Sequence, residues 1–373
     1  MIFSCEREGL TEAISIVQRA ISSKTTNPIL EGIHIKAVAG KIILTGNDNE
    51  IGIEAVVESA VEKDGTIVVN SRLFGDIIRK MTGDIVYINV NEGSIATIKC
   101  GISNFNINGI IGGEFPEIPK FPADFEIILT KSQLRDLVKH TIFSVGTSDT
   151  KLILTGCLLE ANQNMINMVA VDGFRMAYKK IITEQSVLSG TDQAVSIVIP
   201  SKALNEINRS ISDSDDNVII KCSQKNISFE FDNILFTARL LEGQFIDYEK
   251  IIPLESSVVV KVSAVQISNA VERASLIIIS EIAKSPLIMN INNSTVKIDC
   301  ETTSGKVEEL IPVEMTGDSL EIGFNNRFLQ EALRAVDCSE IKMSFNSPVS
   351  PCLIEPAEGE NFKYVILPVR LKT

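Results

Sequence analysis

Three segments of this chain carry the same order of charged side chains: a base, an acid four residues later, and a second base three residues after the acid. Ammonium and guanidinium groups attract phosphate, and a carboxylate between two of them can pair with either and keep that attraction shallow. The pattern therefore favours electrostatic contact with a polyanion. The three sets are Arg72, Asp76 and Arg79; Lys202, Glu206 and Arg209; and Arg327, Glu331 and Arg334.

An α-helix is the element that would place these charges on one surface. At about 100° per residue, positions 72, 76 and 79 fall within about 60° of one another, and positions 74, 77 and 81 fall on the opposite side. Each segment therefore predicts a helix with an apolar back and a charged front. For a single copy, a solvated face with weak ion pairs is the favoured interpretation, but three copies weaken it. The apolar sets are Phe74, Ile77 and Met81; Leu204, Ile207 and Ile211; and Leu329, Ala332 and Val336.

The repeat extends beyond these three helices, which we expect over 71–81, 201–211 and 326–336. A β-rich run precedes each of them (65–71, 195–201 and 319–326) and another follows (85–90, 217–222 and 340–345). A second helix opens each unit, over 7–21, 131–142 and 264–275. Most of the remaining chain alternates between apolar and polar residues, with turn residues between the runs, which is typical of strands. The sequence predicts an α+β fold of three similar domains, at 1–124, 125–253 and 254–373, each with two helices and about eight strands.

Composition limits the class of protein. The chain has 373 residues, a net charge of −13 and 45% hydrophobic residues, so each unit can build a core. No apolar run approaches the roughly 20 residues of a membrane helix. The N-terminal residues lack the apolar core of a secretory leader. Seven cysteines without a CxxC pair favour reduced thiols. These features predict a cytoplasmic protein without membrane contact.

Charge is divided unevenly along the acidic chain. The six expected helices hold 13 of the 35 Lys and Arg residues but only 7 of the 48 acids, so they carry +6 and the rest −19. Lys131, Arg135 and Lys139 form a further basic stripe at i, i+4 and i+8. If the helices share one side of an assembly, that side attracts phosphate.

No catalytic constellation is visible. The two histidines, His34 and His140, lie in different repeats, and a lone histidine is more often structural than catalytic. Phosphate-binding, hydrolase and zinc-protease motifs are absent. The acidic run 212–217 begins like a calcium loop, but Val218 and Gln224 stand where such a loop needs Gly and Glu. We therefore expect no enzyme activity, no metal site and no cofactor.

Several segments, in this order and spacing, resemble the beta sliding clamp family of bacterial DNA polymerase III along essentially the full chain. The segments are NPILEGI (27–33), TGNDNE (45–50), FPEIP (115–119), AVDGFRMAY (170–178), LLEGQFIDYEKIIP (240–253), EIGFNNRFL (321–329) and YVILPVRL (364–371). The resemblance implies a head-to-tail homodimeric ring of six similar domains, with helices lining the hole and strands outside. It implies a processivity factor that encircles double-stranded DNA without sequence preference and tethers the polymerase.

The resemblance also implies partners and sites. A clamp loader complex opens the ring, and the polymerase III catalytic subunit, other polymerases and repair proteins bind through short motifs similar to Q-L-x-L-F. The family's DNA contacts fall on Lys24, Arg72, Arg79, Ser148 and Arg209, to which the internal repeat adds Lys202, Arg327 and Arg334. Ser148 departs from the family pattern, because its side chain is shorter than the amide of some relatives.

The motif pocket of the family lies between the second domain and the C-terminal tail. Phe174, Ile246 and Pro351 depart from the residues common in relatives, so the motif preference is open. Without the resemblance, a packed contact between two domains would be favoured here. The implied pocket comprises Leu154, Val171, Gly173, Phe174, Arg175, Met176, Ile246, Ile251, Pro351, Val365, Leu367, Pro368 and Val369.

The implied ring interface joins the first domain of one copy to the third domain of another. Phe105 and Ile107 match edge-strand positions on the first domain, and Leu276, Ile277, Glu308 and Glu309 match their partners. Two alternatives stay open: a repeat scaffold that binds peptides without encircling DNA, and an enzyme with an unrecognised site. The basic helices argue against the scaffold, which gives no reason for their charge.

Overall fold

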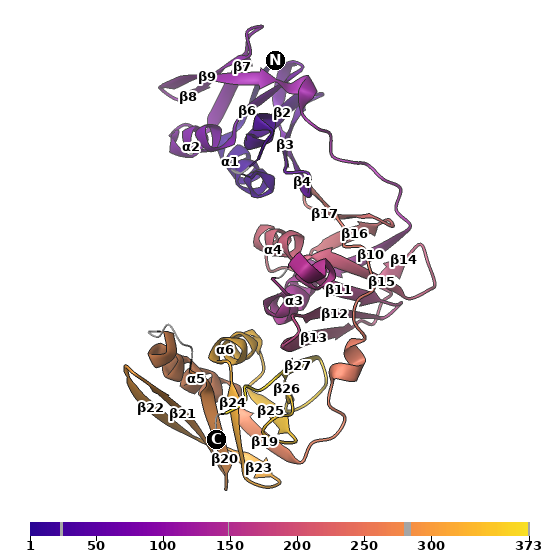
Figure 1. The fold of residues 1–373 in the computed structure, drawn as a ribbon. Coiled ribbons are helices and arrows are strands. Elements are labelled where there is room, and N and C mark those ends of the chain that lie inside the picture. The colour runs from indigo at the N-terminus through magenta and orange to yellow at the C-terminus, as the bar shows by residue number, and fades with distance from the viewer. Residues whose placement is uncertain (23–24, 148, 280–284, 372–373) are drawn as a thin grey trace. The chain divides into compact units, whose positions relative to one another are not determined.

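The computed structural model describes residues 1–22, 25–147, 149–279 and 285–371. It is an α+β fold, as expected (Figure 1). All six expected helices are present among the described residues: α1 (Arg7–Val17), α2 (Ser71–Lys80), α3 (Lys131–Thr141), α4 (Ser201–Ser210), α5 (Ala264–Ile279) and α6 (Asn326–Ala335). Two ends differ from the prediction by more than one residue. α1 passes into a 3₁₀ turn over Gln18–Ala20, and α5 runs four residues beyond 275 because Ile278 continues its buried face.

Contacts divide the chain into two compact units, the first formed by 1–131, 189–191 and 206–240 and the second by 132–188, 192–205 and 241–373. In the first unit the strands follow the order β10-β16-β17-β18-β4-β3-β2-β6-β9-β8-β7-β1-β5. Their bounds are β1 (Ile2–Glu6), β2 (Gly32–Val38), β3 (Lys41–Asn47), β4 (Ile51–Glu58), β5 (Ala60–Lys63), β6 (Gly65–Asn70), β7 (Ile85–Val90), β8 (Ile95–Cys100), β9 (Ser103–Ile111), β10 (Phe125–Thr130), β16 (Asn217–Cys222), β17 (Asn226–Phe231) and β18 (Ile234–Arg239).

The second unit holds a nine-stranded sheet, ordered β15-β11-β12-β13-β27-β26-β25-β19-β23, and a four-stranded sheet, ordered β22-β21-β20-β24. The short strand β14 (Leu188–Ser189) falls at the boundary between the units. The bounds are β11 (Gly156–Ala161), β12 (Met165–Val171), β13 (Arg175–Ile182), β15 (Val195–Pro200), β19 (Val258–Ser263), β20 (Leu287–Asn292), β21 (Thr295–Thr302), β22 (Gly305–Pro312), β23 (Glu314–Thr316), β24 (Leu320–Phe324), β25 (Glu340–Phe345), β26 (Cys352–Pro356) and β27 (Phe362–Ile366).

Antiparallel strand pairing joins consecutive repeats in the same way twice. β18 of the second repeat pairs with β4 of the first, and β13 of the second repeat pairs with β27 of the third. The backbone hydrogen bonds of each sheet therefore continue from one repeat into the next, and an edge strand of each repeat is satisfied by its neighbour. The helices cover one face of these sheets, where α1 lies beside α2 and α5 beside α6 (Figure 1).

The amphipathic prediction for the repeated helices is confirmed by burial. Phe74, Ile77 and Met81 are at most 7% exposed, and the corresponding apolar residues of α4 are at most 4% exposed. In α6, Leu329 and Ala332 are fully buried, whereas Val336 is half-buried and packs against the core from its edge. Asn70 and Asn325 cap α2 and α6, each accepting a hydrogen bond from a backbone amide in the first helical turn.

Candidate functional site

The charged face of α2 is open to solvent. Arg72 and Arg79 are both exposed. Oδ1 of Asp76 lies 2.8 Å from Nη2 of Arg79. The other guanidinium nitrogen of Arg79 donates to Gln18 Oε1 at 3.2 Å, so a neighbouring helical turn orients it. An exposed ion pair of this kind is weak and can exchange one partner for another. The face can therefore offer these cations to a phosphate.

The other two faces keep the order of charges but change the partners. In α4, Glu206 lies 3.0 Å from Arg209 and 3.5 Å from Arg19, so one carboxylate serves two bases. In α6, Glu331 pairs with the earlier base, Arg327, at 2.8 Å, and Arg334 pairs with Glu272 of α5 at 2.6 Å. Lys202, Arg209, Arg327 and Arg334 are all exposed, whereas Lys24 and Ser148 lie outside the described residues.

The basic stripe expected on α3 is wrong at its first position. Lys131 is 2% exposed, and its Nζ lies 2.7 Å from Asp232 and 3.4 Å from Asp216. Hydrogen bonds from Lys131 Nζ to these two carboxylates make the ammonium form more favourable than burial alone would allow, which raises the pKa of Lys131. Lys131 therefore holds the start of α3 to the strands beside it and is not available to a phosphate.

An apolar cluster forms where the sequence places the peptide pocket. Leu154, Val171, Met176 and Val365 are at most 7% exposed and belong to one packed group. Ile246 and Ile251 pack against that group while remaining partly exposed. Sequence reasoning missed several members, and apolar alternation could have pointed only to those that lie in strands, such as Leu158 and Val169. These are Ile153, Leu158, Val169, Tyr178, Val198, Leu241, Phe245, Tyr248, Ile252 and Leu353.

The C-terminal tail closes one side of this cluster. The Leu367 amide donates to Phe174 O at 2.9 Å, and the Val369 amide donates to Gly323 O of β24 at 2.8 Å. Phe174, Leu367 and Val369 remain 62%, 39% and 39% exposed, so the tail presents apolar side chains to solvent beside a buried apolar floor. Pro351 and Pro368 are half-buried. This combination suits an apolar peptide side chain.

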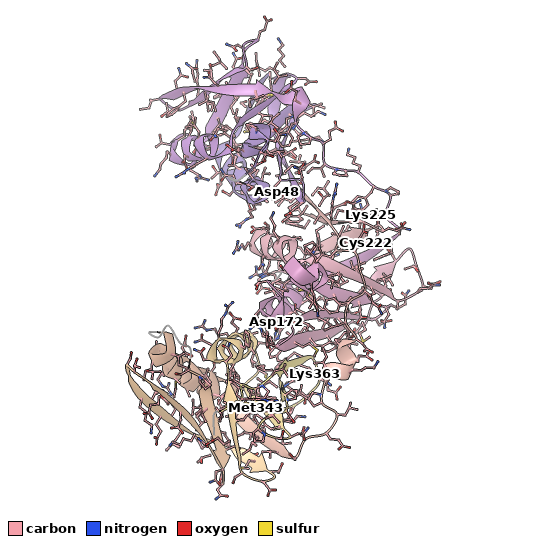
Figure 2. The ribbon with its side chains drawn as sticks, viewed as in Figure 1. Asp48, Asp172, Cys222, Lys225, Met343 and Lys363 are labelled. Atoms are coloured by element: carbon pink, nitrogen blue, oxygen red, sulfur yellow. The ribbon has the colours of Figure 1, made fainter. Side chains whose placement is uncertain are left out.

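The turn before β13 fixes the position of Phe174. Asp172, labelled in Figure 2, accepts hydrogen bonds from the amides of Phe174 and Arg175 at 2.8 and 3.0 Å. Gly173 has a φ of +94°, a conformation that residues with a Cβ rarely adopt. A Cβ there would meet no neighbouring atom within 4 Å, so the backbone conformation alone, and not crowding, favours glycine.

Arg175 is the charged member of the expected pocket, and it is buried. It is 6% exposed and pairs with Asp172 at 2.9 Å and Glu331 at 2.5 Å, with its guanidinium 4.5 Å from the centre of the Phe328 ring. It therefore ties β13 to α6. Burial would raise the pKa of Glu331, but hydrogen bonds from Arg327 and Arg175 outweigh burial and lower that pKa.

Replacing Arg175 should destabilise the second unit. Arg175→Met removes one partner of a buried ion pair, and we expect a loss of about 3 kcal/mol in the free energy of unfolding at neutral pH. Because the lowered pKa of Glu331 stabilises the fold above its unfolded-state value, the difference from wild type should shrink as pH falls through that lowered pKa. Urea unfolding followed by circular dichroism at several pH values measures this.

The control for that variant is Arg209→Met. It removes the arginine of the Arg209–Glu206 ion pair, whose side chain is 63% exposed. It should cost less than about 0.5 kcal/mol. Equal losses for the two variants, or a loss at Arg175 that does not change with pH, would contradict the structural role given to Arg175.

The expected interface residues divide between the two units. In the first, Phe105 is 43% exposed and Ile107 is 6% exposed, both on the face of β9 that holds the core. In the second, Leu276 is 67% exposed and Ile277 is half-buried. Apolar side chains exposed to this degree at a strand and a helix surface fit a protein contact.

The two expected acids of the interface already have partners within the chain. Both oxygens of Glu309 accept from Arg273, at 2.6 and 2.7 Å, and Glu308 lies 3.0 Å from Lys297. The hydrogen bond from Arg273 lowers the pKa of Glu309, so this carboxylate is ionised at neutral pH. Any contact with a second chain must share or exchange these bases.

Among the residues that the structure describes, none of the helices combines the length and the apolar character needed to span a bilayer.

Comparison with known proteins gives one family throughout. Models of the DNA polymerase III beta subunit match residues 1–119 (N-terminal domain), 128–247 (central domain) and 249–370 (C-terminal domain). The beta sliding clamp of Bacillus subtilis is 30% identical over 99% of this chain and 100% of the relative, and that of Staphylococcus epidermidis is 31% identical over 99% of each.

Solved structures agree with those relatives. The sliding clamp structure from Bacillus subtilis has a TM-score of 0.94 at 30% identity and covers 100% of both chains. A putative DNA polymerase III beta subunit from Eubacterium rectale has a TM-score of 0.94 at 32% identity, also over 100% of both. A sliding clamp from Pseudomonas aeruginosa, solved bound to griselimycin, has a TM-score of 0.91 at 26% identity over 100% of both.

Proposed function

The chain belongs to the DNA polymerase III beta subunit family and is a DNA sliding clamp, and from this premise we propose how its own residues perform that function. Two copies close head to tail into a ring around duplex DNA. The ring carries no catalytic activity and no cofactor of its own. It acts in the cytoplasm, where it tethers the replicative polymerase, the clamp loader and other polymerases and repair proteins through short motifs. Its domains are 1–124, 125–253 and 254–373.

The observation that carries this proposal is the repeated base–acid–base face on α2, α4 and α6. Exposed guanidinium groups beside exchangeable carboxylates attract phosphate over a distance but hold no single phosphate firmly. Contacts to phosphate do not depend on the base sequence. Contacts to base edges would hold a sliding protein at one sequence. The same chemistry on three helices provides a track on which the DNA backbone moves past equivalent contacts.

The apolar cluster beside the C-terminal tail supports the second half of the proposal. An exposed Phe174 and Leu367 over a buried floor of Met176 and Val365 suits the leucine and aromatic side chains of a short motif. A repeat scaffold would share this pocket but would have no use for the basic faces, so DNA retention separates the two functions.

Reversing two of the basic positions should weaken DNA binding. Arg79→Glu with Arg209→Glu removes two cations that face phosphate in each chain and adds repulsion. The slope of log affinity against log salt should therefore flatten by about 0.9 for each phosphate that is no longer neutralised. Loading onto nicked circular DNA should fall with it. Fluorescence anisotropy of a labelled duplex at several salt concentrations measures the slope.

The matched control is Lys41→Glu with Lys99→Glu, which changes net charge equally but lies on strands β3 and β8. It should bind duplex DNA as the wild type does. Both double variants should keep the dimer and the affinity for a motif peptide. An unchanged salt slope in the Arg79 and Arg209 variant would remove these faces from the DNA contact.

A further inference from the structure

A buried histidine lies where the second and third repeats meet within the second unit. His140, near the end of α3, is 0% exposed, and its ring packs 5.3 Å from the Phe362 ring of β27. Its two ring nitrogens face different groups. Nδ1 contacts the hydroxyl of Tyr364, and Nε2 faces two carboxylates that come from different elements.

The carboxylates are those of Asp136, one turn earlier on α3, and Asp337, just after α6. Asp136 Oδ1 lies 3.2 Å from Nε2, and Asp337 Oδ2 lies 3.1 Å from it. The nitrogen and both oxygens lie within 4.8 Å of one another. Nε2 can carry at most one hydrogen, so in the absence of another cation the two acceptors share a single donor.

Lys179 and Tyr364 make further contacts that hold Asp136 and His140 in place. Lys179 of β13, with a side chain only 3% exposed, lies 2.9 Å from the other oxygen of Asp136. His140 and Lys179 thus hold the two oxygens of Asp136 from opposite elements, α3 and β13. When a cation takes the place of the Nε2 hydrogen, the Tyr364 hydroxyl can accept a hydrogen from Nδ1, which leaves the Nε2 lone pair for the cation.

We propose that His140 Nε2, Asp136 Oδ1 and Asp337 Oδ2 bind a divalent transition-metal ion of the Zn²⁺ type, which joins α3 to the turn after α6. One imidazole and two carboxylates are ligands that zinc accepts. Bonds of about 2.0–2.1 Å in tetrahedral geometry place ligand atoms roughly 3.3 Å apart, close to the two observed separations from Nε2.

Charge and access suit such an ion. The two carboxylates and Lys179 together carry a charge of −1. A bound dication would change the charge of the cluster to +1. The Asp337 side chain is 42% exposed, so an ion can enter from its side and keep a water as fourth ligand. Spacing motifs in the sequence do not detect this site, because Asp337 lies 197 residues from His140.

The experiment titrates full-length protein, freed of metal by chelation, with Zn²⁺ in a calorimeter at neutral pH. We expect one equivalent to bind per chain and the melting temperature to rise with it. Co²⁺ should give the visible absorption of a tetrahedral ion without a thiolate charge-transfer band, since no cysteine is a ligand. Tyr364→Phe removes the hydroxyl that contacts Nδ1 of His140 and should weaken Zn²⁺ binding about 10–100-fold.

His140→Gln and Asp337→Asn should each remove the binding and the thermal shift. Asp337→Asn is the safer variant because its side chain is partly exposed. His34→Gln is the matched control, since it replaces the only other histidine of the chain and should bind as the wild type does. The proposal is overturned if Zn²⁺ does not bind, or if either His140→Gln or Asp337→Asn binds it with wild-type affinity. In both cases the cluster is a hydrogen-bond network alone.

Discussion

Leu276→Asp should convert the dimer to a monomer at low micromolar concentration. In the proposed ring, Leu276 and Ile277 of one copy meet Phe105 and Ile107 of the other, and a two-fold head-to-tail ring contains this interface twice. Removing a large apolar side chain from such an interface costs roughly 2–4 kcal/mol, and a carboxylate without a partner adds a desolvation cost. A cost of about 3 kcal/mol per interface weakens each one by about 10²-fold.

The structure makes Leu276 a better choice than Ile277 for this test. Leu276 is 67% exposed within one chain, so the new carboxylate should be tolerated by the fold, whereas Ile277 is half-buried. Val265→Asp is the control, because Val265 is 64% exposed on the same helix and is not part of the expected interface. Sedimentation velocity measures the mass of each protein. A Leu276→Asp dimer indistinguishable from wild type would remove α5 from the ring interface.

Leu367→Asp should abolish binding of a synthetic peptide that contains the Q-L-x-L-F pattern. Leu367 is 39% exposed next to Phe174, so in the proposed pocket it gives an apolar wall to the motif. Placing a carboxylate against leucine and phenylalanine side chains desolvates a charge without a partner, and we expect affinity to fall by about 10²-fold or more. Isothermal titration with the peptide measures the change.

A point substitution is sharper here than removal of the tail. Val365 and Ile366 are at most 1% exposed and pair with both β13 and β26, so a deletion from 365 would remove part of a sheet. Val349→Asp is the control, since Val349 is 64% exposed in the same unit but outside the expected pocket. Full peptide affinity in Leu367→Asp, or equal loss in both variants, would place the motif elsewhere.

The repeated helices were predictable because their information is local. Phe74, Ile77 and Met81 recur at helical spacing, and burial on one side of α2 follows directly from that spacing. The same spacing could not predict the first residue of α3. Lys131 has the sequence context of an exposed base, but Asp216 and Asp232, which surround it, come from residues more than 80 positions away.

The candidate pocket shows the same limit. The resemblance placed Met176 and Val365 in one pocket, and the structure brings them into register as opposite partners in β13 and β27. Arg175, which the resemblance placed with them, also pairs with Glu331, 156 residues away. Neither the burial of Arg175 nor the His140 cluster can be predicted from neighbouring residues in the sequence, because both depend on how two repeats pack.

Retention of assembled rings on circular and on linearised DNA tests the central proposal most directly. Wild-type protein is loaded by the clamp loader onto nicked circular DNA and then moved to salt that abolishes binding to a short duplex. If two copies encircle DNA, the rings stay on the circle and leave after the DNA is cut open. Equal loss from the circle and from the linear form would show ordinary electrostatic binding and contradict the proposed ring.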